Sequence, residues 1–268
     1  MIKKYKYILF WIVITAYSLI TLGFSAIKRE QVVCSNIEVI ITDNTDNYFV
    51  EKEDVISMFL SKGIALEGVN INKINVNELE KILNNDPSIK NSQVYTRIDG
   101  SVIIEVEQRN PIVRVINRKN ESYYIDEQGE IMPLSPKYTA HVLIANGNIN
   151  ESQDLLYSTN ITSLSDKDVI GRRYVIKDIY NIALHVYNNE FWKSMIEQIY
   201  VNINNDLELI PRVGNHTVIF GTAEDMYEKF RKLKVVYKLG LKQSGWNKYT
   251  TINLKYKNQV VCTKKPLL

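Results

Sequence analysis

Two pairs of carboxylates stand at strand spacing in this 268-residue chain: Glu105 with Glu107, and Asp206 with Glu208. Residues two apart in a strand point to the same face, so each pair could bring two carboxyl groups together for acid–base catalysis. The same spacing is typical of the solvated face of a half-exposed sheet, and we favour that interpretation. These four carboxylates are therefore predicted to be surface groups.

The residue types that bind metals are scattered. His141, His185 and His216 lie in unrelated segments, and none stands three or four residues from another side chain of the types that bind zinc. Cys34 and Cys262 form no C-x-x-C motif, which favours two unpaired thiols, although a single disulfide in an oxidising compartment stays open. We expect no metal site and no cofactor.

Signatures of common enzymes are also missing. The chain has no G-x-S-x-G, no H-E-x-x-H and no glycine-rich phosphate loop. Its net charge of +3 is too small to indicate nucleic-acid binding. The sequence thus predicts neither an enzyme nor a nucleic-acid-binding protein, and no small-molecule substrate is expected.

Residues 8–27, ILFWIVITAYSLITLGFSAI, carry no charge. As a helix rising about 1.5 Å per residue, they would cover the roughly 30 Å hydrocarbon core of a membrane. A cleaved signal peptide is the alternative, but its apolar region spans about 7–15 residues and ends at a small-x-small site, which Phe24–Ala26 fits poorly. Three lysines precede the run and favour a cytoplasmic N-terminus. We predict a short cytoplasmic tail, residues 1–7, and a transmembrane helix over 8–27.

The segment after the anchor has the pattern of a small two-layer module. Alternation of apolar and polar residues over 37–41 predicts a strand. Helical spacing predicts helices over 49–63 and from Asn75 to Asp86, where Asn75 and Glu78 have the spacing of a capping box. Asp99-Gly100 then separates two β-rich runs at hairpin spacing. The order β-α-α-β-β predicts helices packed on one side of a small sheet whose other side is wet.

A second domain is predicted beyond Pro111, because proline removes a backbone donor and interrupts a strand. Strands are expected over 112–116 and 122–126, a helix over RYVIKDIYNIALHVYNN, and three consecutive antiparallel strands over EQIYVNI, LELIP and HTVIFG. A further helix has Thr222 at its predicted N-cap and Gly240 at its C-cap. The predicted fold class is α+β, with a mixed α/β second domain and a mainly antiparallel sheet.

The chain closes with a stretch, Leu254–Val261 or LKYKNQVV, that has strand character but no hairpin partner after it. A terminal edge strand exposes unpaired N–H and C=O groups. These groups promote aggregation unless charged side chains prevent pairing or a partner strand binds them. Lys255 and Lys257 would blunt one face, and Tyr256 still offers aromatic contact. We favour addition of a partner's strand over simple protection by the lysines.

Five blocks along the chain resemble the bacterial cell-division family FtsQ/DivIB. They are VEQRNP at 106–111, YYIDEQGEIMPLS at 123–135, ELIPRVGNHTVIFG at 208–221, EKFRKLKVVYKLGL at 228–241 and GWNKYTTINLKYKNQVVCTK at 245–264. The resemblance covers the whole chain. It implies a POTRA domain over 35–109, the family's β domain over 110–262, and a C-terminal tail over 263–268.

The resemblance also implies a non-enzymatic role. Proteins of this family dock onto the partners FtsB and FtsL and help to recruit or regulate septal peptidoglycan synthesis by FtsW and FtsI. The implied location is a single-pass type II protein of the cell (inner) membrane, with its C-terminal domains periplasmic or extracytoplasmic at the division septum. The family's partner-binding region matches the positions Ile252, Leu254, Lys255, Tyr256, Lys257 and Asn258.

Two other function classes are open because a fold alone does not decide function. A POTRA-type envelope chaperone or polypeptide-transport component would carry repeated modules or a following series of barrel strands, whereas one module is visible in the sequence. An anchored envelope hydrolase would need a catalytic constellation, and the sequence shows none.

Overall fold

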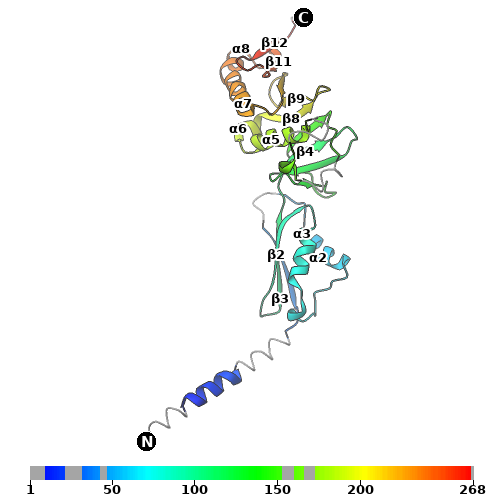
Figure 1. Cartoon of the computed structure of the whole chain (residues 1–268), viewed down its shortest axis with the longest axis vertical. Helices are drawn as coiled ribbons and strands as arrows, with labels where there is room; N and C mark the ends of the chain where they lie inside the picture. The colour runs from blue at the N-terminus through cyan, green and yellow to red at the C-terminus, as the bar shows by residue number, and fades with distance from the viewer. Residues whose placement is uncertain (1–9, 22–31, 43–46, 153–159, 166–172, 267–268) are drawn as a thin grey trace. The chain divides into compact units, whose positions relative to one another are not determined.

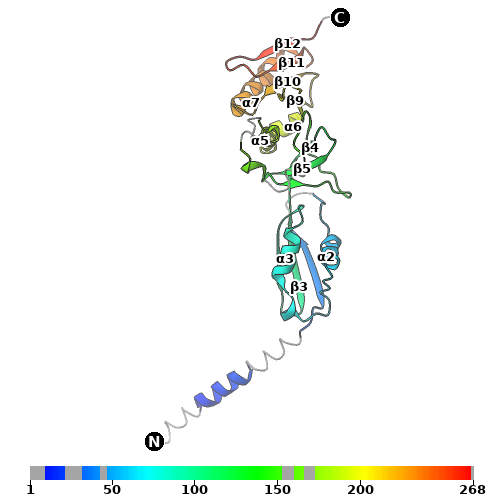
Figure 2. The same ribbon diagram turned by 45° about the vertical axis from the view of Figure 1, so that its right-hand side comes forward.

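The structure is a computed structural model that describes residues 10–21, 32–42, 47–152, 160–165 and 173–266. The chain divides into two compact units, Met1–Gln108 and Arg109–Leu268. Figures 1 and 2 show the ribbon from two directions.

The first unit is a three-stranded sheet with two helices. Its strands lie in the order β1-β3-β2, with β3 parallel to β1 and antiparallel to β2. The elements in chain order are β1 (Asn36–Ile41), α2 (Lys52–Ser61), η1 (Ile71–Lys73), α3 (Val76–Asn84), β2 (Ile89–Thr96) and β3 (Ser101–Gln108). The predicted order β-α-α-β-β is confirmed.

Local signals explain these elements. The Asn75 side chain accepts a hydrogen bond from the Glu78 N–H at 3.3 Å, so Asn75 is the N-cap at which α3 begins. Gly100 has φ +90° in the β2–β3 hairpin, a conformation that favours glycine. Ile103 lies on the same face of the central strand as Glu105 and Glu107, which is the face predicted to be wet. It is fully buried, so that prediction is wrong at this residue. In the strand register it lies between Tyr95 and Glu38, whose longer side chains flank it.

The second unit is built on a mixed nine-stranded sheet, in the order β12-β11-β10-β9-β8-β7-β4-β5-β6. Its strands are β4 (Pro111–Ile116), β5 (Ser122–Asp126), β6 (Ile131–Met132), β7 (Leu143–Gly147), β8 (Ile196–Val201), β9 (Leu207–Pro211), β10 (Thr217–Gly221), β11 (Tyr249–Asn253) and β12 (Val261–Lys264). Its helical elements are η2 (Ile161–Ser163), α5 (Val175–Tyr187), α6 (Glu190–Met195), α7 (Met226–Val235), η3 (Val236–Leu241) and α8 (Lys242–Ser244).

The sheet contains both parallel and antiparallel pairs. The pairs β4–β7, β7–β8 and β10–β11 are parallel, and the remaining neighbours are antiparallel. The predicted run of three consecutive antiparallel strands is confirmed as β8, β9 and β10. The prediction of a mainly antiparallel sheet is thus confirmed, with parallel pairs at three places.

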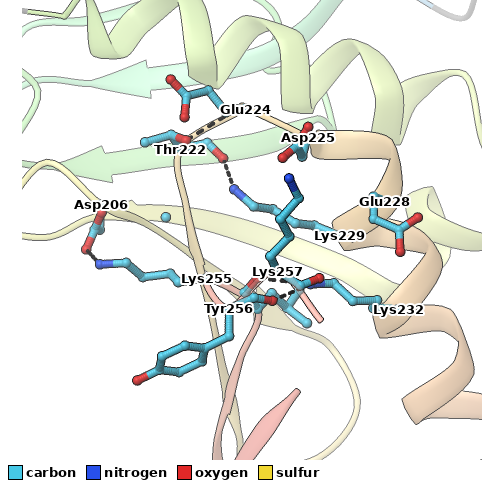
Figure 3. A pocket seen from close by; sticks show the side chains of 12 residues that line it. Asp206, Thr222, Glu224, Asp225, Glu228, Lys229, Lys232, Lys255, Tyr256 and Lys257 are labelled. Atoms are coloured by element: carbon cyan, nitrogen blue, oxygen red, sulfur yellow. Dashed lines mark hydrogen bonds and ion pairs between the residues drawn. The ribbon is translucent and has the colours of Figure 1, made fainter. Parts of the chain in front are cut away.

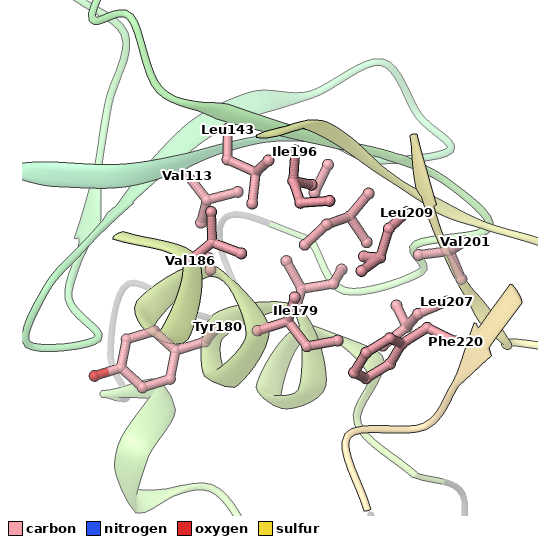
Figure 4. Packing of buried hydrophobic residues seen from close by; sticks show 14 of the residues in the cluster. Val113, Leu143, Ile179, Tyr180, Val186, Ile196, Val201, Leu207, Leu209 and Phe220 are labelled. Atoms are coloured by element: carbon pink, nitrogen blue, oxygen red, sulfur yellow. The ribbon is translucent and has the colours of Figure 1, made fainter. Parts of the chain in front are cut away.

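Helix α5 packs its apolar face on the middle of the sheet (Figure 4). Ile179 of α5, Val113 of β4 and Leu209 of β9 are all fully buried. Burying a side chain of this size stabilises the fold by roughly 1.5–3 kcal/mol. A distant carboxylate caps the helix, because Glu151 Oε1 accepts from the Val175 N–H at 2.9 Å, and a negative charge is favoured at a helix N-terminus.

Both predicted ends of the later helix are wrong. Helix α7 begins after Asp225, at φ +51°, and Thr222 instead accepts from the Glu224 N–H at 3.3 Å in the turn before it. Gly240 does not end the helix, which continues as a π-helical turn and a short α-helix up to Gly245, at φ +91°. The fully buried Leu241 explains the continuation, because ending at Gly240 would remove it from the core.

The predicted anchor is only partly described. Residues 10–21 form a helix whose side chains are exposed, whereas residues 8–9 and 22–27 of the predicted span, and the predicted tail 1–7, lie outside the described residues. Within the described part of the chain, we find no helix with both the length and the apolar character needed to cross a membrane.

Candidate functional site

The last strands form one end of the large sheet. Because β10 and β11 are parallel, both end at the same edge, where Gly221 and Asn253 lie. β12 runs antiparallel to β11, with Ile252 opposite Cys262 and Asn253 opposite Val261. On the other side of β12 no strand of the described residues pairs with it.

Residues 254–260 of the predicted strand Leu254–Val261 are not in a strand, which corrects the sequence prediction. β11 ends at Asn253, a bend and turn follow, and pairing resumes only at Val261. The physical reason is local: the Asn253 side chain accepts from the Lys255 N–H at 3.0 Å, and such side-chain bonds compete with a strand ladder. At this end of the sheet, the edge strand among the described residues is therefore β12 itself.

The backbone direction of β12 follows from its pairing. The Lys265 N–H donates to the Lys248 carbonyl at 3.0 Å, so it points toward β11. Successive backbone groups in a strand point to opposite sides, so the N–H groups of Lys264 and Cys262 point to the free edge. Val261 keeps 41% of its surface exposed there. This edge of β12 therefore presents backbone N–H groups that no strand of the described residues uses.

The six positions implied by the family resemblance fall into two groups. Ile252 and Leu254 are fully buried, so they support the core from within. Lys255, Tyr256, Lys257 and Asn258 lie together in the exposed turn between β11 and β12. Only this second group is placed to touch another molecule directly.

A pocket of about 290 Å³ lies beside this turn (Figure 3). Both lysines and carboxylates line the pocket, so its surface carries positive and negative groups side by side. Lys255 Nζ contacts Asp206 Oδ2 at 2.6 Å, and Lys229 Nζ donates to the Thr222 carbonyl at 2.8 Å. The lining residues are Asp206, Gly221, Thr222, Glu224, Asp225, Glu228, Lys229, Lys232, Leu254, Lys255, Tyr256 and Lys257.

Two groups in the pocket are constrained by their surroundings. Lys229 is only 8% exposed, and burial lowers its pKa; its ammonium also lies 5.2 Å from the centre of the Phe220 ring. Gly221 has φ +80°, and a Cβ there would lie 3.0 Å from Lys255 Cγ. A side chain at Gly221 would therefore both strain the backbone and displace Lys255.

The carboxylate pairs make no shared site. Asp206 binds Lys255, whereas Glu208 Oε1 accepts from Asn202 Nδ2 at 2.9 Å. In the first unit, Glu107 pairs with Lys90 at 2.8 Å and Glu105 accepts from the Tyr95 hydroxyl at 2.8 Å. Each of these carboxylates thus has its own surface partner, as expected for groups on a solvated face.

The histidines have structural surroundings. His216 is 3% exposed, its Nε2 lies 3.0 Å from the Tyr237 hydroxyl, and burial lowers its pKa. His185 stacks on Phe230, and burial lowers its pKa too. Cys34 and Cys262 are both free thiols. Within the described ranges, no three His, Cys, Asp or Glu side chains are grouped to hold a metal ion.

Sequence reasoning missed Asp206, Lys229 and Lys232 as residues that shape this site. The positions of the two lysines in the sequence of α7 could have indicated their role. They lie three apart in α7, and each directly precedes a buried residue, Phe230 or Leu233, so both lie beside the apolar face of the helix. Lysines in this position cover apolar surface with their stems and carry the ammonium to nearby carbonyls.

Comparison with known proteins gives two family matches. Residues 110–263 match the model described as FtsQ/DivIB, C-terminal related. Residues 32–107 match the POTRA-like domain. A search of curated proteins gives no match. Because the first match covers more than half of the chain, and the second covers most of the rest, the protein belongs to the FtsQ/DivIB family.

Proposed function

We propose that this protein is a non-enzymatic scaffold of the cell-division machinery, anchored in the cell membrane at the septum. Its C-terminal edge docks FtsB- and FtsL-type partners and thereby helps to recruit or regulate the FtsW/FtsI synthase. Family membership supports the division role. The observation that carries the docking role is the free edge of β12.

Edge chemistry favours strand addition at this position. β12 is four residues long and is paired on one side. No strand of the described residues forms hydrogen bonds with its outward amides and carbonyls. Main-chain hydrogen bonds from an added strand would satisfy them, and neighbouring side chains would give specificity. Val261 on the strand and the half-exposed Tyr256 on the turn supply apolar contact. Lys264 and the turn lysines discourage unwanted pairing.

We also propose that the N-terminal apolar run anchors the protein. Residues 10–21 are helical, and Phe10, Trp11 and Leu19 expose 59%, 63% and 70% of their surface. Twelve helical residues rise about 18 Å, short of the roughly 30 Å core, so spanning requires the full run 8–27 of the sequence. The remaining units would then lie outside the cytoplasm.

Deleting residues 1–31 is expected to move the protein from the membrane to the soluble fraction. The physical reason is the loss of every residue of the uncharged run, which the bilayer would otherwise hold by its apolar surface. Cell fractionation followed by alkaline carbonate extraction measures this. Release of the full-length protein by carbonate would contradict the anchor, because only peripheral proteins are extracted in that way.

Lys264→Pro is the direct test of docking. Proline removes the outward N–H of residue 264 and places its ring at the free edge, without removing a donor to β11. We expect the dissociation constant for the extracytoplasmic region of FtsB to rise about tenfold, as for the loss of one good hydrogen bond. Isothermal titration calorimetry with residues 32–268 gives this value.

Lys264→Ala is the matched control, because it removes the same side chain and keeps the amide. It should bind FtsB nearly as well as the wild type does. Thermal unfolding of both variants near the wild-type temperature would show that β12 still pairs with β11. If Lys264→Pro bound FtsB as tightly as the wild type does, strand addition at β12 would be contradicted.

A further inference from the structure

One lysine binds the turn that carries the exposed docking residues. Lys232 Nζ lies 2.7 Å from the Tyr256 carbonyl, 3.4 Å from the Leu254 carbonyl and 3.4 Å from the Lys257 carbonyl. Figure 3 shows its side chain reaching from α7 to the turn. Three carbonyls of one short turn thus converge on a single ammonium.

Such convergence has a physical reason. A turn leaves its carbonyls without ladder partners, and an ammonium offers three donors that can serve several of them at once. Hydrogen bonds from a charged donor are stronger than those between neutral groups. The position of the Lys232 side chain is set in turn by α7, whose residues Phe230 and Leu233 are buried in the core.

A second lysine of α7 makes the equivalent contact one strand away. Lys229, three residues before Lys232, donates to the carbonyl of Thr222, the residue that follows β10. Lys232 binds the carbonyls that follow β11. The two ammonium groups of α7 therefore bind the backbone carbonyls that directly follow two neighbouring parallel strands, β10 and β11. In this way α7 stabilises the ends of both strands at this edge of the sheet.

We propose that Lys232 is a positioning residue for partner docking: it fixes the turn 254–260 and, through it, the register and order of β12. This inference rests on the proposed function. β12 has only four residues and one paired side, so the turn decides how far it is ordered before a partner arrives. Ordering the strand in the free protein removes a cost that the partner would otherwise meet on binding.

Lys232→Met tests the proposal, because methionine keeps an unbranched apolar stem but has no donor. Two quantities are measured with residues 32–268: the dissociation constant for the extracytoplasmic region of FtsB, and amide hydrogen exchange of residues 254–264 in the free protein. We expect about tenfold weaker binding and about tenfold faster exchange in this segment, since the turn loses its charged donor. Exchange in α7 should stay as in the wild type.

Two further variants control the experiment. Lys234→Met removes the same charge from the same helix, but its Nζ lies over the Phe191 ring at 5.2 Å and not at the turn. It should leave both quantities unchanged. Lys232→Arg keeps a cation of similar reach and should restore part of the protection and of the affinity, which a change in net charge alone would not explain.

The outcomes separate the two proposals. Equal exchange and affinity in Lys232→Met and Lys234→Met would overturn the positioning role while wild-type binding keeps the proposed function. Weaker binding with unchanged exchange would also overturn it, since Lys232 would then contact the partner directly. Faster exchange throughout α7 would mean that the helix itself had unfolded, again against the proposal. If the wild type binds no FtsB, docking fails, and the exchange data alone decide the role of Lys232.

Discussion

Replacing Asp126 with alanine is expected to lower the free energy of unfolding of the second unit by about 3 kcal/mol. Asp126 is 1% exposed, and both its oxygens are used. Oδ1 accepts from the N–H groups of Gln128 at 2.9 Å and Glu130 at 2.8 Å, which closes the β5–β6 turn. Oδ2 accepts from Arg109 Nη1 at 2.9 Å. Alanine would leave all three donors without this acceptor.

The size of this effect follows from burial. Removing one partner of a buried ion pair costs about 3–5 kcal/mol, and we take the lower end because the Arg109 side chain is 17% exposed and can reach water. Urea unfolding of residues 32–268 measures the change. Asp126→Asn keeps a carbonyl oxygen for the turn and loses the charge, so it should fall between alanine and the wild type.

Asp99 is a useful comparison, because it makes the same kind of turn in an exposed place. Its Oδ1 accepts from the Ser101 N–H at 2.9 Å in the β2–β3 hairpin. Water can replace this bond, so Asp99→Ala should cost clearly less than Asp126→Ala. Equal losses for the two variants would show that the Arg109 pair and the burial of Asp126 contribute little.

Much of the fold follows from local patterns in the sequence. The β-α-α-β-β order of the first unit and the β8, β9, β10 series come from short-range periodicity and turn residues, which act over a few positions. The N-cap residue Asn75 is a signal of the same kind. Such features could be predicted because the interactions that determine them lie within each element.

The errors have a common cause in tertiary contacts and competing local bonds. Gly240 looks like a helix end, yet the burial of Leu241 carries the helix past it. Apolar alternation continues through Leu254 and Tyr256, but the Asn253 side chain turns the chain before them. The sequence pattern alone does not show whether core burial or a local side-chain hydrogen bond determines the structure at a given position.

The site was predictable only in part, for a related reason. The exposed turn residues were found through the family resemblance, whereas the residues that hold them come from elsewhere in the chain. Lys232 bonds to Tyr256, 24 positions away, and Lys255 to Asp206, 49 positions away. No spacing rule in a single sequence links such pairs; the parallel pairing of β10 and β11 brings them together.

Phe230→Ala should lower the free energy of unfolding by about 4 kcal/mol, the largest single-residue effect that we expect. Phe230 of α7 is 2% exposed, and its ring centre lies 4.3 Å from that of His185, 4.9 Å from that of Trp192 and 5.0 Å from that of Phe220. It therefore joins α7 to α5, α6 and β10, and alanine would leave a cavity where these four elements meet. Urea unfolding measures the loss.

The same variant tests whether the core affects the edge of the sheet at which we propose docking. Phe230 lies between Lys229 and Lys232 in sequence, so a shift of α7 into the cavity would carry both ammonium groups away from the carbonyls that they bind. Phe230→Leu fills most of the space and should lose less stability and less FtsB affinity, and Val235→Ala, half exposed on the same helix, should change neither. FtsB binding by Phe230→Ala should be measured under conditions where the variant stays folded. If it bound FtsB as tightly as the wild type does, the packing of α7 would not control the turn 254–260, because the helix would have moved without an effect on the edge of the sheet.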